Sequence, residues 1–260
     1  MLNILLTNDD GYQADGIRAM GAALAEAGHR VTMLAPSGNR SCTSHRITVH
    51  DRLAIESHGE TGGVPVYSCS GTPADCVRVG VLSGLFDRPD TVVSGINHGV
   101  NLGDDVRYSG TVSAAAEAAL LGLPGVAISQ QGDDPTIRFL AERPSRFEHL
   151  ELLNSLVVWF AGSGTDGNLL NVNVPSGHAE TSLRWSRLGR RQWRDVTMEV
   201  DRSDSGTALV KAWASDARPV LATGSDFAAV ADGAVAVSLL TVGGGLVDVT
   251  DPAAQGLPRR

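Results

Sequence analysis

Several residue types are scarce in this chain, and each scarcity narrows what the protein can be. The three cysteines form no Cys-x-x-Cys pair, which argues against a disulfide framework and favours a reducing cytoplasm. No apolar run approaches the roughly 20 residues of a membrane span. The apolar start, residues 1–7, is too short for a signal peptide and is followed at once by acidic residues. We therefore expect a soluble, cytoplasmic protein.

Positive charge is also scarce. The net charge is −8, and Lys211 is the only lysine. A nucleic-acid-binding groove as the main function is not expected, because such grooves carry a basic footprint. A single nucleotide phosphate is not excluded, since a metal, a few local cations and backbone amides are enough to hold it. The seven histidines are scattered with no His-x-x-x-His pair, so a zinc-type site is not expected.

The chain does contain a regular alternation of strand and helix patterns in its first 180 residues. Short apolar strands are predicted at 3–7, 31–35, 91–94, 126–129 and 169–174. Helical spacing or helix-start signals are found at 17–24, from 72 onward, at 109–121 and at 147–160. Strands that alternate with helices predict an α/β fold with a mostly parallel sheet and right-handed crossovers.

The pattern changes after Pro175. Residues 183–185, 196–200 and 208–213 alternate apolar and polar side chains, with polar turns between them. This alternation is typical of an antiparallel ribbon. We expect the ribbon to extend from the core and to take part in self-association.

Three polar clusters come where strands of the predicted sheet end, and ligands of open α/β sheets bind at that edge. The first is Asn8-Asp9-Asp10-Gly11, in which two adjacent carboxylates beside a buried strand call for a counter-charge such as a hard divalent cation. Taken alone, the motif is explained equally well by an acidic turn. The second, residues 36–44, offers hydroxyls, an amide and a guanidinium to an oxyanion or a metal, although an ordinary polar loop has the same composition.

The third cluster, residues 94–111, gives the strongest indication of function. Asn97 and Asn101 offer neutral oxygen ligands, and Ser109-Gly110-Thr111 comes where a helix is predicted to begin. Exposed amides and the helix dipole make such a start an anion site, and a glycine lets a phosphate come close. A loop this long and this rich in glycine and asparagine is usually functional. His98 lies in this loop as a possible proton donor.

These clusters together resemble the SurE family of nucleoside-monophosphate phosphatases. The resemblance rests on the residues of the three clusters and on a later stretch, 224–230, all in the same order along the chain. It implies a Rossmann-like, three-layer α/β/α core with an extended antiparallel β-hairpin and a C-terminal segment swapped between subunits of a homodimer or homotetramer. On this basis we expect a catalytic core at 1–180 and a hairpin and oligomerisation segment at 181–260, within a single SurE-type domain.

The resemblance also implies a site. One divalent metal ion, Mg²⁺ or Mn²⁺ or another divalent ion, is expected on Asp9, Asp10, Ser41 and Asn97, and the two aspartates are the expected catalytic residues. The expected substrate contacts come from Asn8, Asn39, Asn101, Ser109, Gly110 and Thr111. Cys42 stands where relatives usually have glycine, and His98 where many have a small residue.

The implied reaction is hydrolysis of nucleoside 5′-monophosphates, with 3′-monophosphates as a second class, by a water molecule that the metal activates. A related phosphatase acting on a specialised pathway intermediate or on short polyphosphate is an alternative. A covalent aspartyl-phosphate enzyme usually has an Asp-x-Asp spacing, which is absent here. A dinucleotide-binding protein would need a Gly-x-Gly-x-x-Gly turn after the first strand, and a regulatory nucleotide-binding module would bind without metal. No nucleic acid or membrane partner is expected.

Overall fold

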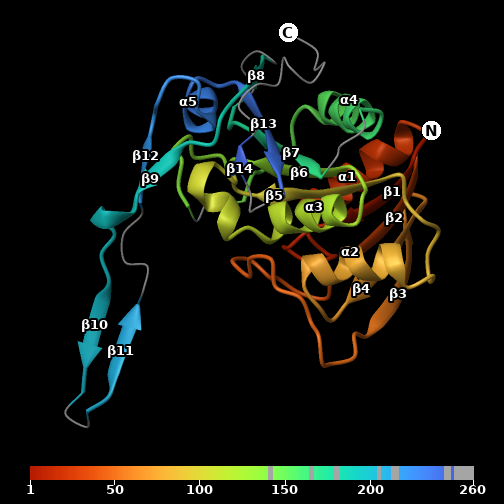
Figure 1. The fold of residues 1–260 in the computed structure, drawn as a ribbon, viewed down its shortest axis with the longest axis horizontal. Coiled ribbons are helices and arrows are strands. Elements are labelled where there is room, and N and C mark those ends of the chain that lie inside the picture. Colours follow the sequence, from red (N-terminus) through yellow and green to blue (C-terminus); the bar gives the residue numbers. More distant parts are fainter. Residues whose placement is uncertain are drawn as a thin grey trace.

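A computed structural model describes residues 1–139, 143–163, 167–177, 182–203, 206–211, 217–242 and 247–248. Its body is built on one large sheet, from which a narrow two-stranded arm projects (Figure 1). Within the described residues, no helix is long and apolar enough to cross a membrane.

The sheet is mostly parallel, as predicted. Its strands are ordered β14-β13-β7-β6-β5-β1-β2-β4-β3, and β8 also pairs with β13. The parallel series comprises β1 (Asn3–Thr7), β2 (Arg30–Pro36), β4 (Val64–Cys69), β5 (Thr91–His98), β6 (Gly125–Gln130) and β7 (Asn168–Val174). At the two edges, β3 (Ile55–Thr61) runs antiparallel to β4, β13 (Val235–Thr241) to β7, and β14 (Val247–Asp248) to β13. The predicted α/β class is therefore confirmed.

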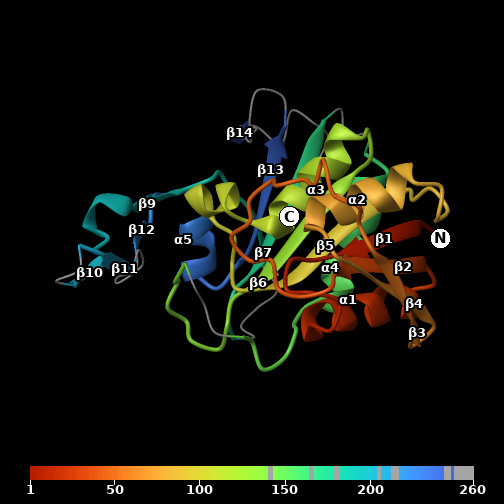
Figure 2. The ribbon, with the colours of Figure 1, turned by 90° about the horizontal axis from the view of Figure 1, so that it is seen from below.

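Helices cover both faces of this sheet and give the expected three layers. Helices α1 (Asp15–Glu26) and α4 (Leu150–Ala161) pack on one face, and α2 (Pro73–Leu82) and α3 (Gly110–Leu120) on the other (Figure 2). Side chains of β1 alternate accordingly, since Ile4 and Leu6 enter the α1–α4 core while Leu5 enters the α2–α3 core. Parallel strands buried on both faces explain why their sequences read as continuous apolar runs.

Helix starts follow the capping signals in the sequence. Thr72 caps α2 in a capping box, in which its Oγ1 accepts the Asp75 N–H while Asp75 Oδ2 accepts the Thr72 N–H. Ser109 caps α3, and its Oγ accepts the Val112 N–H at 3.1 Å. The predicted strands and helices of the first 180 residues are thus all present, with boundaries shifted by a few residues.

The arm begins where the chain leaves the body. Strand β9 (Arg190–Gln192) pairs with β12 (Arg218–Val220), the short helix η2 (Trp193–Asp195) follows β9, and β10 (Glu199–Arg202) pairs antiparallel with β11 (Ala208–Lys211). An antiparallel ribbon was predicted here. The prediction was wrong for 183–185, because this segment is β8 (Leu183–Trp185) and pairs in parallel with β13 in the main sheet.

After the arm, the chain returns to the body. Helix α5 (Asp226–Ala231) and strand β13 lie against the core, with Phe227 fully buried. The boundary expected at residue 180 stays a prediction, although β8 and β13 belong to the main sheet. The segment expected to be swapped between subunits lies largely outside the described residues.

Candidate active site

A cavity of about 220 Å³ opens at the carboxyl edge of the sheet, beside its central strands. Strand β1 lies between β5 and β2, so the chain leaves it toward one side for β2 and later returns on the other side for β5. Such a change of direction is where open α/β sheets bind ligands. The loops after β1 and β2 and the end of β5 all contribute to the lining of this cavity. The three predicted clusters are therefore neighbours in space.

Asp9 is an almost fully buried acidic group of the cavity, with 4% of its surface exposed. Thr111 donates its hydroxyl hydrogen to Asp9 Oδ1. Gly110 packs directly behind the carboxylate, where a Cβ atom would lie 2.8 Å from Asp9 Cβ. Burial, and then the charge of Asp10, raise the pKa of Asp9 from its ordinary value of 3.8 to about 6, and the Thr111 bond offsets part of this rise.

Asp10 lies beside His98. Asp10 Oδ2 accepts the backbone N–H of His98 at 3.2 Å, and Oδ1 is 3.5 Å from His98 Nδ1. Burial raises the pKa of Asp10, while the His98 N–H and the positive charge of Arg143 act in the opposite direction. Burial and Arg143 lower the pKa of His98, which favours the neutral imidazole.

The loop after β2 is tied to both neighbouring strands. The Arg40 backbone N–H donates to the Asp9 carbonyl at 2.6 Å, and its guanidinium donates to carbonyls at the end of β4. Asn39 Oδ1 accepts the Ser41 N–H at 2.9 Å. Cys42 follows with a positive φ of 58°, a conformation that glycine adopts most easily. These contacts hold Ser41 at the cavity that the acidic pair also lines.

The amide oxygens of the third cluster are turned to serve as acceptors. Asn97 Nδ2 donates to the Gly99 carbonyl at 2.8 Å, so this amide nitrogen is already engaged. Asn101 donates Nδ2 to Ser129 and its backbone N–H to Asn173. Both side chains line the cavity, and each keeps its Oδ1 as an acceptor for a ligand there.

Most of the predicted site residues come together around this one cavity. The lining includes Asp9, Asp10, Asn39, Ser41, Asn97, Asn101 and Ser109. Three predicted substrate contacts lie behind it instead, namely Asn8, Gly110 and Thr111. Asn8 closes its own loop through two hydrogen bonds to Gly11, and the other two support Asp9.

The donor set fits a hard divalent cation. Nowhere in the described ranges do three His, Cys, Asp or Glu side chains gather into a metal-binding group. The cavity offers the carboxylates of Asp9 and Asp10 together with neutral oxygens, while the third carboxylate of its lining, Asp105, is paired with Arg191. Asp9, Asp10, Ser41 and Asn97 all present oxygen, the ligand that Mg²⁺ and Mn²⁺ prefer. The raised pKa values of the two aspartates have the same implication, because a cation would offset the burial and mutual repulsion of their charges.

Sequence reasoning missed two residues of the cavity. Arg143 and Phe139 line it from the loop between β6 and α4. Neither stands next to a strand end or in a recognisable motif, so no local signal in the sequence points to them. Arg143 is the one arginine or lysine in the described lining, and its charge acts on both Asp10 and His98.

Comparison with known proteins identifies the family. The family model "Survival protein SurE" matches residues 4–195. The 5′-nucleotidase SurE of Rubrobacter xylanophilus is 38% identical over 258 residues, covering 97% of this chain and 94% of the relative. That of Prochlorococcus marinus (strain MIT 9313) is 44% identical over 201 residues, covering 75% of this chain and 71% of the relative. The crystal structure of the SurE protein from Aquifex aeolicus superposes with a TM-score of 0.73 at 32% identity, covering 92% of this chain and 93% of that one. This chain belongs to the SurE family.

Proposed function

We propose that this chain is a divalent-metal-dependent phosphomonoesterase that hydrolyses nucleoside 5′-monophosphates, and 3′-monophosphates as a second class, to nucleoside and phosphate. The observation that carries the proposal is the pairing of Asp9 and Asp10 in a cavity that also presents the neutral oxygens of Ser41 and Asn97 and is bordered by the start of α3. Relatives that carry the name 5′-nucleotidase support the same reaction class.

The start of α3 is the proposed phosphate position. Ser109 lines the cavity, and the helix begins at the next residue, so the helix dipole and the first backbone N–H groups favour an anion there. Arg143 adds a full positive charge to the same lining. Both groups act on the oxygens that carry negative charge as phosphorus is attacked.

The acidic pair is the proposed metal position. A divalent cation on Asp9, Asp10, Ser41 and Asn97 would offset the two carboxylates and supply Lewis acidity to a phosphate oxygen. Thr111 holds the Asp9 carboxylate in one orientation, and His98 does the same for Asp10. One of these carboxylates orients the water that attacks phosphorus in line with the departing alcohol, and it accepts the proton of that water.

Phosphate release over a panel of substrates tests this proposal. The panel contains nucleoside 5′- and 3′-monophosphates, sugar phosphates and short polyphosphate, each with Mg²⁺, Mn²⁺ or a chelator. We expect release from nucleoside monophosphates that depends on metal. Release mainly from sugar phosphates or polyphosphate would favour the alternative substrate classes. Nucleotide binding without turnover, unaffected by chelator, would favour a regulatory module and contradict the proposal.

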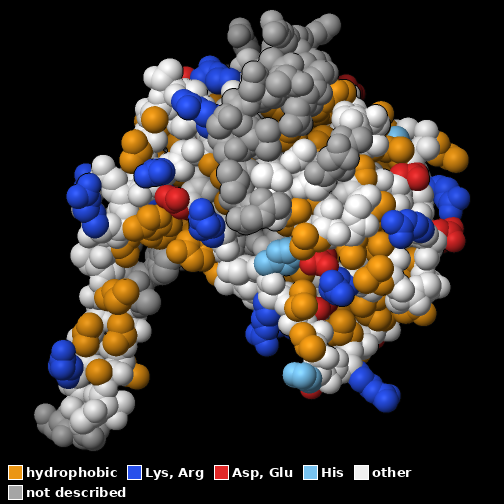
Figure 3. All heavy atoms as spheres, in the orientation of Figure 1, with side chains coloured by type: hydrophobic (Ala, Val, Ile, Leu, Met, Phe, Trp, Pro, Cys, Tyr) orange, Lys and Arg blue, Asp and Glu red, His pale blue; other side chains and the backbone are white. Residues whose placement is uncertain are grey.

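The arm is the proposed contact with further copies of the chain, in a homodimer or homotetramer. Its exposed apolar side chains are Met198, Val200, Leu209 and Val210, each more than half exposed. Figure 3 shows hydrophobic side chains along this arm, which stands clear of the body. A lone two-stranded hairpin is marginally stable in water, so a covering partner would stabilise it. A cytoplasmic location stays an expectation that the three free cysteines support.

A further inference from the structure

Three aromatic rings meet at one side of the cavity, although only 5% of the chain is aromatic. Tyr108 precedes the start of α3, Phe139 comes from the loop before α4, and Trp193 comes from η2 at the base of the arm. The ring centroids are 5.8 Å apart for Tyr108–Phe139 and Tyr108–Trp193, and 5.6 Å apart for Phe139–Trp193, all edge-to-face. Three separate segments of the chain thus build one aromatic cluster.

This cluster belongs to the cavity rather than to the core. Tyr108 and Phe139 line the same cavity as Asp9 and Ser41, while Trp193 packs against both rings. Tyr108 is 41% exposed, which is unusual for a ring whose only task is to fill the interior. It also adjoins Ser109, the proposed phosphate position. The cavity therefore joins a polar, charged part to an aromatic part.

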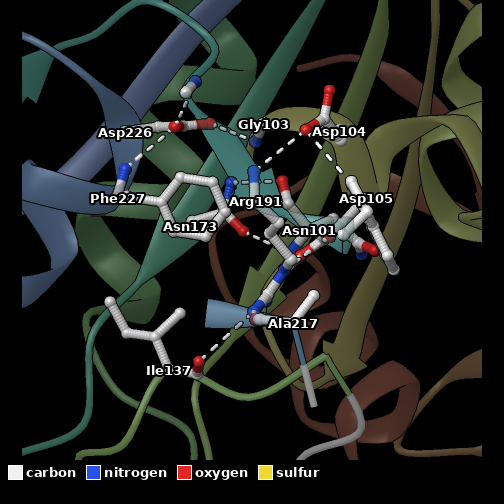
Figure 4. A network of polar contacts seen from close by, with 12 residues as sticks. Asn101, Gly103, Asp104, Asp105, Ile137, Asn173, Arg191, Ala217, Asp226 and Phe227 are labelled. Atoms are coloured by element: carbon white, nitrogen blue, oxygen red, sulfur yellow. Dashed lines mark hydrogen bonds and ion pairs between the residues drawn. The ribbon is translucent and has the colours of Figure 1, made fainter. Parts of the chain in front are cut away.

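Contacts with Arg191 and Asp104 hold Phe139 and Trp193 in place, and Figure 4 shows the polar contacts that Arg191 makes. The Arg191 guanidinium lies over Phe139, with its carbon 5.9 Å from the ring centroid, and donates to the carbonyls of Ala217 and Ile137. Trp193 Nε1 donates to Asp104 Oδ2 at 3.3 Å. Rings fixed in this way lose little further freedom when a ligand stacks on them.

We infer that Tyr108 and Phe139, backed by Trp193, form a stacking subsite for the nucleobase of the substrate. The inference rests on the proposed function and deepens it. A nucleoside monophosphate carries a phosphate at one end and a flat aromatic base at the other, and the cavity offers a matching group for each. Stacking accepts every base because each has a π-face, so the subsite selects nucleotides over sugar phosphates without selecting strongly among bases.

Paired kinetics on two substrates test the subsite. Adenosine 5′-monophosphate and ribose 5-phosphate share the phosphate and the sugar, and only the first has a base. We expect Phe139→Leu to lower kcat/KM for the nucleotide about tenfold, mainly through KM, and to leave ribose 5-phosphate within about twofold. Phe139→Tyr keeps a ring and should retain nucleotide activity. Phe86→Leu is the matched control, since Phe86 pairs edge-to-face with Tyr67 and does not line the cavity.

The possible outcomes separate the subsite from the proposed function. The subsite is overturned if Phe139→Leu and Tyr108→Leu leave kcat/KM for the nucleotide unchanged. It is also overturned if they lower kcat/KM equally for both substrates while their melting temperatures match that of the parent. In either case the phosphatase proposal stands. If the parent enzyme releases phosphate from neither substrate, the proposed function fails instead. Should Phe139→Leu fail to fold, Tyr108→Leu gives the same comparison, because this exposed ring contributes less to packing.

Discussion

The Arg191 guanidinium meets the Asp105 carboxylate in a bidentate ion pair shielded from solvent. Arg191 Nε is 2.8 Å from Oδ1 and Nη2 is 2.8 Å from Oδ2, and the two side chains are 0% and 2% exposed. Arg191 lies in β9 at the base of the arm, and Asp105 lies in the short helix η1 (Gly103–Arg107), where it lines the cavity. The pair therefore fixes the arm to the edge of the candidate active site.

Removal of Arg191 is expected to be costly. In Arg191→Met the Asp105 carboxylate stays buried without its partner, which should lower the free energy of unfolding by about 3–5 kcal/mol. Urea titration of the variant measures this loss. The double variant Arg191→Met/Asp105→Asn should recover part of it, because the uncompensated charge is gone. Arg30→Met is the control, since Arg30 and Asp87 form an exposed pair and its loss should cost less than about 1 kcal/mol.

Asp9→Asn should abolish phosphate release. In the presence of a chelator, the same substitution should raise the free energy of unfolding at alkaline pH. The folded-state pKa of Asp9, about 6, lies above the ordinary value of 3.8. The contribution of Asp9 to the free energy of unfolding is therefore fully present below pH 3.8 and is lost as the pH rises through 6. Asparagine avoids the buried charge, so the variant should gain up to about 3 kcal/mol at pH 8 and less than about 1 kcal/mol at pH 4.

Thermal melts of both proteins at the two pH values measure this difference. Differences between variant and parent cancel the titration of the other acidic groups. A gain of the same size at pH 4 and pH 8 would show that Asp9 does not carry a raised pKa.

Cys42→Gly should keep activity and equal or exceed the parent in stability. Cys42 has a φ of 58°, and a side chain in this conformation costs roughly 1 kcal/mol that glycine avoids. Burial and the charges of Asp9 and Asp105 raise the pKa of the Cys42 thiol, so alkylation at neutral pH should be slow. Cys42→Val should be the less stable variant, because a branched side chain fits this conformation poorly. Loss of phosphate release in Cys42→Gly would give the thiol a role that we do not assign to it.

Charges on the arm should disrupt the proposed assembly. Val200 and Leu209 are 51% and 71% exposed on β10 and β11. Val200→Glu/Leu209→Glu should convert oligomers to monomers in light scattering, because glutamates would be buried at the contact. Val158→Glu is the matched control, with a 43% exposed valine on α4. A parent protein that is already monomeric would refute this role of the arm.

The sequence predicts the parallel core well because buried parallel strands are short apolar runs with clear ends. Asn3–Thr7 and Thr91–His98 are of this kind. The strands Ile55–Thr61, Val64–Cys69 and Val235–Thr241 were missed. In Ile55–Thr61, six of the seven residues are exposed, so its apolar signal is weak. Leu183–Trp185 alternates like a ribbon strand, but its pairing partner, β13, is decided by contacts some fifty residues away that no local pattern encodes.

Some residues of the candidate site were likewise predictable from the sequence, and others were not. Asp9 and Ser41 follow strand ends and Asn97 lies in the last residues of β5, so the topology of the sheet brings them together. Phe139 and Arg143 reach the cavity from a loop whose path depends on tertiary contacts, among them the Ile137 carbonyl on Arg191. Chain order alone gives no reason to place that loop over the acidic pair.

Calorimetric titration of chelator-treated protein with Mn²⁺ tests the central claim most directly. We expect one binding event per chain in the parent and in the control variant Asp87→Asn, because Asp87 is exposed and does not line the cavity. Binding should be lost or strongly weakened in Asp10→Asn and Asn97→Ala, and phosphate release from adenosine 5′-monophosphate should fall with it. Equal Mn²⁺ affinity in all four proteins, or full activity in chelator, would contradict the assignment of Asp9, Asp10, Ser41 and Asn97 as the metal site.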